Sequence, residues 1–333
     1  MCHQNPLRRS LQRLVLLVCV ATCSAALACQ VPVFRYALER WNPDAYRIVV
    51  LGDGELGAAQ EEMLSQIRAA HKSKRVEMTF IDANKTADPT LIHLWKHHRD
   101  HSVPLLAAFY PVGSKDLSNT LAYQKALTKR SAASIIDSPV RREIAKRLKL
   151  GHSAVWIFVK SGNADRDKVA YETLEKQIKL DSEWLKLPSP EELEVDASVL
   201  ANCKIKLQIK FSIVTVEKDN AEEQFLLDSL FNSEPDLRSF DGPFAFPVFG
   251  RGRVLYGLVN KGIVKDTIRS ASSFMAGPCS CQVKNQNPGF DLLLVSDWES
   301  AIGDTLISEP IDTPNQENLE PTLVPIPPGR KSK

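Results

Sequence analysis

The chain has 333 residues, of which 44% are hydrophobic and 25% charged, and its formal net charge is +2. This balance is typical of a globular protein and excludes both wholesale disorder and a membrane protein with many spans. Residues 29–307 contain 36 basic and 36 acidic groups, so the body of the chain is neutral. Because nucleic-acid-binding proteins carry a basic surface, we expect no nucleic-acid partner.

Residues 1–28 are typical of a secretory signal peptide. Three arginines and no acidic residue precede an apolar run that begins at Leu14. Ala26 and Ala28 give the small-x-small pattern of a cleavage site. The apolar run is shorter than the roughly 20 residues that a membrane-spanning helix needs. We therefore expect an exported protein whose mature chain begins near residue 29.

Cys29 directly follows the predicted cleavage site. Bacterial lipoproteins carry lipid on their first mature cysteine, although they usually have leucine where this chain has Ala26. The sequence leaves two locations open, a periplasmic protein or one anchored to the membrane through Cys29. A disulfide is the third possibility, because the exported chain keeps Cys29, Cys203, Cys279 and Cys281 and the sequence does not fix their pairing.

Hydrophobic periodicity predicts alternating strands and helices in the first part of the mature chain. Strand-like runs cover residues 46–51, 76–81, 105–110 and 154–159. Helical patterns cover residues 55–71, a segment that begins at Asp88, residues 139–150 and residues 165–185. These elements form a predicted first domain over residues 29–187, which ends at a proline-rich connection.

A second domain is predicted over residues 188–307. Its expected elements are strands at 205–216 and 290–295, helices at 221–231 and 263–275, and a hairpin with arms at 243–249 and 254–258. Arg251 and Arg253 fall at the hairpin turn, where they could bind an anion, although we favour ordinary exposed side chains. Residues 308–333 are rich in proline and polar residues, which predicts a disordered tail.

The alternation predicts an α/β fold with two α/β-sandwich domains. The element order of the first domain, strand, helix, strand, helix, proline, strand, resembles that of thioredoxin. Pro104 stands where thioredoxins carry a cis-proline, so it is our candidate cis-proline; the alternative is a generic α/β sandwich in which Pro104 is trans and ends a loop. The resemblance implies a redox centre near residues 52–55, but no cysteine lies there, which implies a redox-inactive scaffold. Whether the second domain is a related copy stays open.

Residues 52–57 read Gly-Asp-Gly-Glu-Leu-Gly after a predicted strand, which matches the spacing of a dinucleotide-binding turn. Asp53 and Glu55 would repel the pyrophosphate that such a turn binds. We therefore favour a plain strand-to-helix turn without a nucleotide cofactor. An exported nucleotide-dependent dehydrogenase is the least favoured function.

Four histidines lie between residues 93 and 101. His93, His97 and His101 are four residues apart, so on one continuous helix they would share a face. That arrangement is a candidate zinc or copper site. The alternative is a solvated helix end, where histidines interact favourably with the helix dipole.

Cys279 and Cys281 form the remaining candidate for chemistry. Two cysteines separated by one residue can close a strained, oxidising disulfide or offer two soft ligands to copper or zinc. The alternative is a structural bridge from one of them to Cys203 or Cys29.

Three stretches, residues 29–41, 243–253 and 277–284, together resemble a group of uncharacterised exported bacterial proteins. The resemblance implies export through a signal peptide or as a lipoprotein and carries no activity. Since no catalytic motif is recognisable, we expect a non-enzymatic binding or accessory module of the cell envelope, with an envelope protein or a small ligand as partner. The rival function is thiol-dependent redox or metal handling by Cys279 and Cys281. We predict no resident cofactor, and the oligomeric state stays open.

Overall fold

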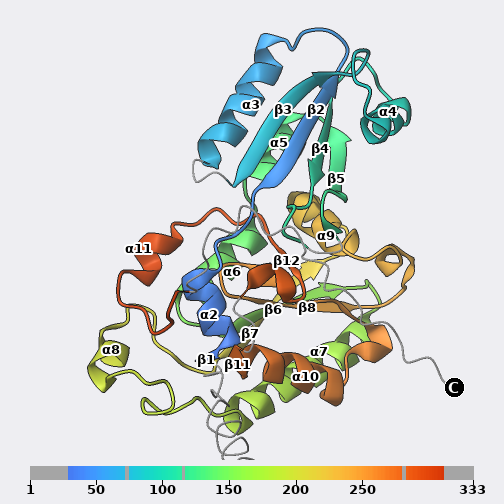
Figure 1. The fold of residues 1–333 in the computed structure, drawn as a ribbon. Coiled ribbons are helices and arrows are strands. Elements are labelled where there is room, and N and C mark those ends of the chain that lie inside the picture. The colour runs from blue at the N-terminus through green and yellow to red at the C-terminus, as the bar shows by residue number, and fades with distance from the viewer. Residues whose placement is uncertain (1–28, 72–74, 115–116, 280–282, 311–333) are drawn as a thin grey trace, which may run out of the picture.

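The computed structural model describes residues 29–71, 75–114, 117–279 and 283–310. Two helix-covered β-sheets lie one above the other (Figure 1). The predicted α/β class is confirmed. The predicted signal peptide lies outside the described residues, as does the predicted tail from residue 311 onward.

Strands and helices alternate along most of the chain. The strands are β1 (Cys29–Pro32), β2 (Tyr46–Gly52), β3 (Val76–Asp82), β4 (Leu105–Phe109), β5 (Leu121–Ala126), β6 (Ala154–Lys160), β7 (Phe211–Glu217), β8 (Phe244–Phe249), β9 (Arg253–Val254), β10 (Leu258–Val259), β11 (Pro278–Cys279) and β12 (Phe290–Asp291). The helices are α2 (Val33–Arg40), α3 (Ala58–Ala70), α4 (Pro89–Lys96), α5 (Lys129–Ile136), α6 (Pro139–Lys149), α7 (Ala164–Trp184), α8 (Ala197–Asn202), α9 (Gln224–Phe231), α10 (Lys265–Ala276) and α11 (Trp298–Ile302).

The first sheet has the strand order β3-β2-β4-β5. β2 runs parallel to β3 and antiparallel to β4, and β4 runs antiparallel to β5. Alternate residues of β2 face opposite layers. Ile48 and Val50 join the core that contains α3 and α5, whereas Val49 and Leu51 pack with α4.

The second sheet has the strand order β12-β9-β8-β6-β7, and β10 pairs with β8. β6 runs parallel to β7 and antiparallel to β8. The predicted hairpin is present, with Phe249 of β8 opposite Arg253 of β9. Val155 and Ile157 pack on the layer that contains α6, and Trp156 and Phe158 pack on the layer that contains α7 and α10. β6 is therefore covered on both faces, which explains its continuous apolar sequence.

The two sheets share one connectivity. In each sheet a central first strand leads through helical structure, α3 in the first sheet and α7 with the short α8 in the second, to a parallel neighbour, and a further helix then leads to two antiparallel strands. These strands are β2, β3, β4 and β5 in the first sheet and β6, β7, β8 and β9 in the second. Pro104 directly precedes β4, and Pro243 precedes β8 at the equivalent point. The two sheets thus share one topology, although the chain shows no repeat at the level of its residues.

The sheets divide the chain differently from the predicted boundary at residue 187. β6 was assigned to the first domain from its position, yet it hydrogen-bonds with β7 and β8. β1 pairs with β11, and α2 packs in the same core as β8 and α10. We therefore call residues 46–136 the first unit, and residues 29–40 together with 139–308 the second unit.

Two predicted strands are shorter than expected. The run at 205–216 becomes a strand only from Phe211, because other groups bind the preceding carbonyls: Ser153 Oγ donates to the carbonyl oxygen of Gln208 and Ser153 N to that of Lys210. The run at 290–295 is a strand only over β12, after which Leu292 N donates to Gly252 O. At both places the apolar periodicity correctly predicted buried residues, but the backbone hydrogen bonds of the sheet do not extend over the whole apolar run.

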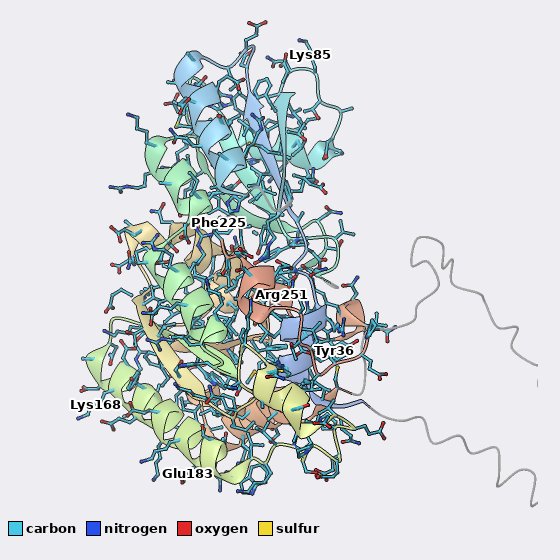
Figure 2. The ribbon with its side chains drawn as sticks, turned by 90° about the vertical axis from the view of Figure 1, so that its left-hand side faces the viewer. Tyr36, Lys85, Lys168, Glu183, Phe225 and Arg251 are labelled. Carbon is cyan, nitrogen blue, oxygen red and sulfur yellow. The ribbon has the colours of Figure 1, made fainter. Side chains whose placement is uncertain are left out.

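The α9 helix joins the two units. Its Phe225 ring lies 5.7 Å from the Tyr46 ring and 5.3 Å from the Tyr123 ring, centroid to centroid, and both tyrosines belong to the first sheet. Figure 2 shows Phe225 at the level where the first unit meets the second. Phe225 also belongs to a core cluster that contains Val50 and Val155, so one hydrophobic core extends through both units.

Candidate functional site

Cys29 and Cys279 lie at the end of the second unit where the described part of the chain begins. Cys29 and Cys279 are cross-strand partners in the antiparallel pair of β1 and β11. Cys279 is buried, with 1% of its surface exposed, in the core beneath α10. Cys281 lies outside the described residues, so a joint action of Cys279 and Cys281 stays a prediction.

Cys203 is a free, buried thiol. Its Sγ lies 3.3 Å from the carbonyl oxygen of Val199 and 3.6 Å from that of Thr305, and it donates to these oxygens. Burial raises the pKa of the Cys203 thiol. The pairing of Cys203 with another cysteine, which the sequence left open, is not present in the structure.

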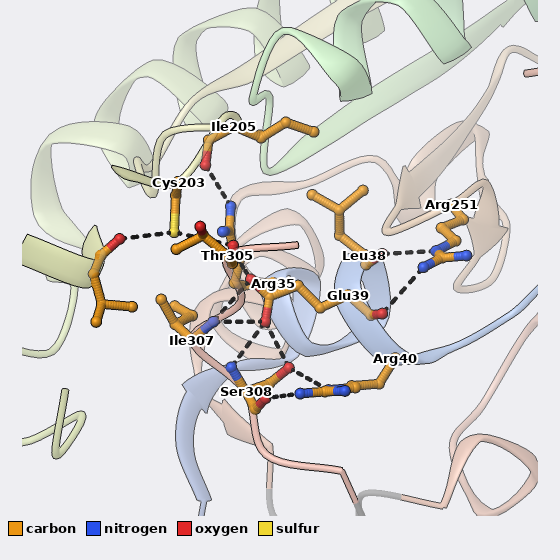
Figure 3. A network of polar contacts seen from close by, with 11 residues as sticks. Arg35, Leu38, Glu39, Arg40, Cys203, Ile205, Arg251, Thr305, Ile307 and Ser308 are labelled. Atoms are coloured by element: carbon orange, nitrogen blue, oxygen red, sulfur yellow. Dashed lines mark hydrogen bonds and ion pairs between the residues drawn. The ribbon is translucent and has the colours of Figure 1, made fainter. Parts of the chain in front are cut away.

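A buried ion pair beside Cys203 joins α2 to the C-terminal segment of the second unit (Figure 3). Arg35 Nε donates to Glu39 Oε1 at 2.6 Å, and Arg35 Nη1 donates to the Ile205 carbonyl. Glu39 also accepts from the backbone N–H groups of Ile307 and Ser308 at 3.1 and 2.8 Å. Every partner is supplied by the protein, which is the condition under which a buried ion pair is tolerated. The arrangement is structural and offers no open position for a ligand.

Arg251 and Arg253 are buried, so the prediction of exposed turn arginines is wrong. Arg251 donates to the Leu38 and Glu39 carbonyls at the end of α2, where the helix leaves its last acceptors unpaired (Figure 3). Arg253 donates to the Pro288 carbonyl and lies 3.3 Å from Asp291. Neither guanidinium can receive an external anion without displacing these partners.

Asp291 is the buried acid of this cluster. Burial alone would raise the pKa of Asp291, but the neighbouring cations of Lys284 and Arg253 hold it below its usual range. Lys284 also lies 2.8 Å from Asp44, so the cluster ties β12 to the segment before β2. This cluster therefore fastens the segment that leads into the first unit, and its residues line none of the hollows described below.

The histidines do not form one site. The helix α4 ends at Lys96, so His101 leaves the face that His93 occupies, against the prediction of one shared helix face. The His93 and His97 rings lie 4.2 Å apart, whereas the His101 ring lies 4.6 Å from the Trp95 ring. The described residues contain no group of three or more histidines, cysteines or acids that could hold a metal ion.

The Gly-rich segment at 52–57 is a turn between β2 and α3. Gly54 has a φ of 77°, a conformation that glycine adopts without strain. Asp53 is exposed and accepts from the side-chain amide of Asn84. Asp53 and Glu55 are both exposed at this turn, where their carboxylates would repel a pyrophosphate.

Pro104 is trans, since the described residues contain no cis peptide bond, and the prediction of a cis-proline is wrong. The trans isomer is the favoured one by about 0.5–1 kcal/mol in an ordinary X–Pro bond. Pro104 leads directly into β4, and its carbonyl accepts from Leu127 N at 2.7 Å, beyond the end of the β4–β5 ladder. The proline therefore begins a strand.

The equivalent turn of the second unit lies between β6 and α7. The buried Asp167 accepts from Ser161 N, Ser161 Oγ and Gly162 N, which fixes the turn from inside. Arg166 donates to both the carbonyl and the carboxylate of Asp241, two residues before Pro243. No cysteine occurs in this turn. No local sequence pattern marks this turn as a site, because the loop that contains Asp241 lies far away in the chain.

Two adjoining hollows form a groove between α7 and β7, the edge strand of the second sheet. One hollow, of about 700 Å³, is lined by Phe158, Tyr171 and Thr215. The other, of about 460 Å³, shares Tyr171 and continues to Phe211 and Ile213. In Figure 2, Lys168 and Glu183 mark positions toward the two ends of this α7–β7 groove. The groove has an apolar and aromatic floor with charged side chains at its rim. No sequence pattern predicted this groove.

A third hollow, of about 450 Å³, lies where β5 meets the end of α9. Its lining is mostly polar. Arg238 lies beside it and is already paired with Asp228 and Asn232, at 2.6 and 2.7 Å. This hollow therefore has a less apolar lining than the α7–β7 groove.

No family model, no curated protein and no solved structure matches the chain. None of the described helices is both long and apolar enough to cross a membrane. The functional interpretation therefore rests on the residues and geometry of this protein alone.

Proposed function

We propose that the protein is a non-enzymatic binding module of the cell envelope, built on two tandem thioredoxin-like units that lack a redox centre. Support for the scaffold comes from the sheet order, which is the same in both units and has one parallel and two antiparallel neighbour pairs. Support for the loss of redox function comes from the two strand-to-helix turns, residues 52–57 and 161–163, neither of which contains cysteine. Export is supported by residues 1–28.

The α7–β7 groove carries the binding proposal. Apolar floors with charged rims are typical of peptide and ligand sites, because the floor supplies affinity and the rim supplies orientation. The neighbouring strand β7 is an edge strand, and an extended peptide can add to such an edge through backbone hydrogen bonds. We therefore expect the groove to bind an extended segment of an envelope protein. Tyr171 would be its central aromatic contact.

A peptide-display library panned against the exported protein tests this proposal. Thr215 is exposed in the groove, and Thr215→Arg would fill it. Thr79 is an exposed threonine on β3, the equivalent edge strand of the first unit, so Thr79→Arg is the matched control. We expect selected peptides to bind the wild type and Thr79→Arg equally and to bind Thr215→Arg at least tenfold more weakly. Equal binding to all three proteins would refute the groove as the site.

The thiol-dependent alternative receives less support. Reactive cysteines are partly exposed and lie in electropositive surroundings. Cys279 is buried in an apolar core instead. Thiol labelling and metal analysis of the purified protein decide the matter: labelled Cys279 and Cys281 without bound metal would eliminate this alternative.

A further inference from the structure

We propose that Cys29 and Cys279 form a disulfide that joins β1 to β11, and that Cys29 therefore carries no lipid. The inference goes beyond the proposed function, on which it depends only for an oxidising compartment. Of the roles of Cys29 that the sequence left open, the proposal favours a disulfide over lipid attachment.

The strand register brings the two residues together. Cys29 and Cys279 are direct cross-strand partners in an antiparallel pair. The α-carbons of such partners lie about 4.5 Å or 5.5 Å apart, depending on the hydrogen-bonding position. Disulfides span α-carbon distances of about 4.4–6.8 Å, so both positions fall within that range. The register shifts between Cys29 and Pro32, but the pairing of Cys29 with Cys279 itself brings the two backbones together although 249 residues separate them in the chain.

The two short strands are fixed from both sides. Pro32 is the partner of Pro278, and the next residue, Val33, donates its backbone N–H to the Gly277 carbonyl at 2.9 Å. α2 follows β1 directly, and α10 ends just before β11. Because both helices pack in one core, the register of β1 against β11 follows from the packing of α2 on α10.

The surroundings of Cys279 suit a disulfide. Cys279 lies in a cluster with Val31, Phe34 and Met275, with 1% of its surface exposed. A disulfide is neutral and apolar, so it can lie in such a core without a hydrogen-bond partner. Burial also keeps external reductants away from the bond.

The other cysteines are weaker partners. The Sγ atom of Cys203 already lies against the backbone carbonyls of Val199 and Thr305. A bond between Cys279 and Cys281 would close a ring across a single residue, Ser280, which is strained. The cross-strand pair of Cys29 and Cys279 falls within the α-carbon distances that disulfides span.

Formation of the bond requires an oxidant. The proposed one is a dithiol–disulfide oxidoreductase of the exported compartment. A thiolate of Cys29 or Cys279 attacks the disulfide of the oxidoreductase and forms a mixed disulfide with it. The second cysteine then attacks this mixed disulfide and releases the oxidoreductase. The two cysteines lose two protons and two electrons, and the oxidoreductase is released as its dithiol. Lipid attachment would need the same sulfur atom of Cys29, so the two modifications exclude each other.

Peptide mapping tests the proposal. The full chain is produced in a bacterium with its own leader, its thiols are blocked with an alkylating agent, and it is digested with trypsin without reductant. Trypsin places Cys29 in residues 29–35 once the leader is removed, and both Cys279 and Cys281 in residues 270–284. We expect these two peptides to be linked in the wild type and in Cys281→Ser, and unlinked in Cys279→Ser. Cys203 should carry the alkylating agent only.

Three outcomes would overturn the proposal: acylated Cys29, alkylated Cys29 and Cys279, or a link that persists in Cys279→Ser. If Cys279→Ser does not fold, thiol titration of the unfolded wild type replaces it. Four cysteines follow residue 28, so titration should find two reactive thiols, rising to four after reduction. Reduced protein re-oxidised with oxidised glutathione separates this proposal from the export proposal: failure of export alone leaves the chain reduced in cells, yet the link still forms in the glutathione buffer.

Discussion

Glu39→Ala tests whether the buried network around α2 stabilises the second unit. Glu39 pairs with Arg35, and both side chains are almost completely buried. The substitution leaves the Arg35 guanidinium without its counter-ion. It also removes the acceptor of the backbone N–H groups of Ile307 and Ser308.

The expected loss of stability is large. Removal of one partner from a buried ion pair costs about 3–5 kcal/mol, because the other charge stays buried without compensation. Glu143 and Arg147 provide the matched control, since they form an ion pair of the same i,i+4 spacing and similar length, 2.7 Å, on α6. Their side chains are 37% and 26% exposed, so Glu143→Ala should cost less than about 1 kcal/mol.

Guanidinium-induced unfolding measures both costs, and amide hydrogen exchange locates them. Glu39→Ala should lose protection first at Ile307 and Ser308, whereas Glu143→Ala should leave these amides protected. Glu39→Gln keeps an acceptor oxygen and should lie between Glu39→Ala and the wild type, which keeps the test informative if the alanine variant does not fold. Equal costs for Glu39→Ala and Glu143→Ala would refute the reasoning.

Two further predictions concern pH and backbone shape. Burial lowers the pKa of His71 to about 4 from 6.5. Between these two pH values the histidine is protonated in the unfolded chain and neutral in the folded chain. The stability due to neutral His71 is intact above pH 6.5 and falls by about 3 kcal/mol by pH 4. Urea unfolding at pH 7 and pH 4 should show this loss in the wild type and in the exposed-site control His97→Gln, and much less of it in His71→Gln. A methyl group at Gly289 would overlap the Val254 carbonyl oxygen, whereas one at Gly54 would meet open space, and both glycines have positive φ. Gly289→Ala should therefore lower the melting temperature far more than Gly54→Ala, and similar shifts would contradict the described packing.

Local sequence signals predicted the elements well. Residues 46–51 and 76–81 were predicted as strands and form β2 and β3, because apolar runs and turn residues reflect local backbone preferences. The hairpin around Arg251 was predicted for the same reason. The place of β6 in the second sheet was not predicted, because its pairing with β8 depends on residues far away in the chain.

The candidate sites were predicted less well. Charge in a turn predicted exposure for Arg253, yet this guanidinium satisfies backbone carbonyls inside the protein. The regular spacing of His93 and His101 predicted one face, but spacing does not show where a helix ends. The α7–β7 groove has no sequence signal, because Phe158 and Thr215 meet only when β6 and β7 pair.

The crossing of residues 29–40 into the second unit determines when that unit can be completed. The first unit has all its strands between residues 46 and 126, so its sheet can form while the rest of the chain is still being made. α2 must wait for Ile307 and Ser308 before its buried Glu39 is satisfied. At about 5–20 residues per second, that wait lasts roughly 15–50 s. The core in which α2 packs also contains β8 and α10, so this helix, the first in the described part of the chain, completes its packing only after residues 244–276 have been made.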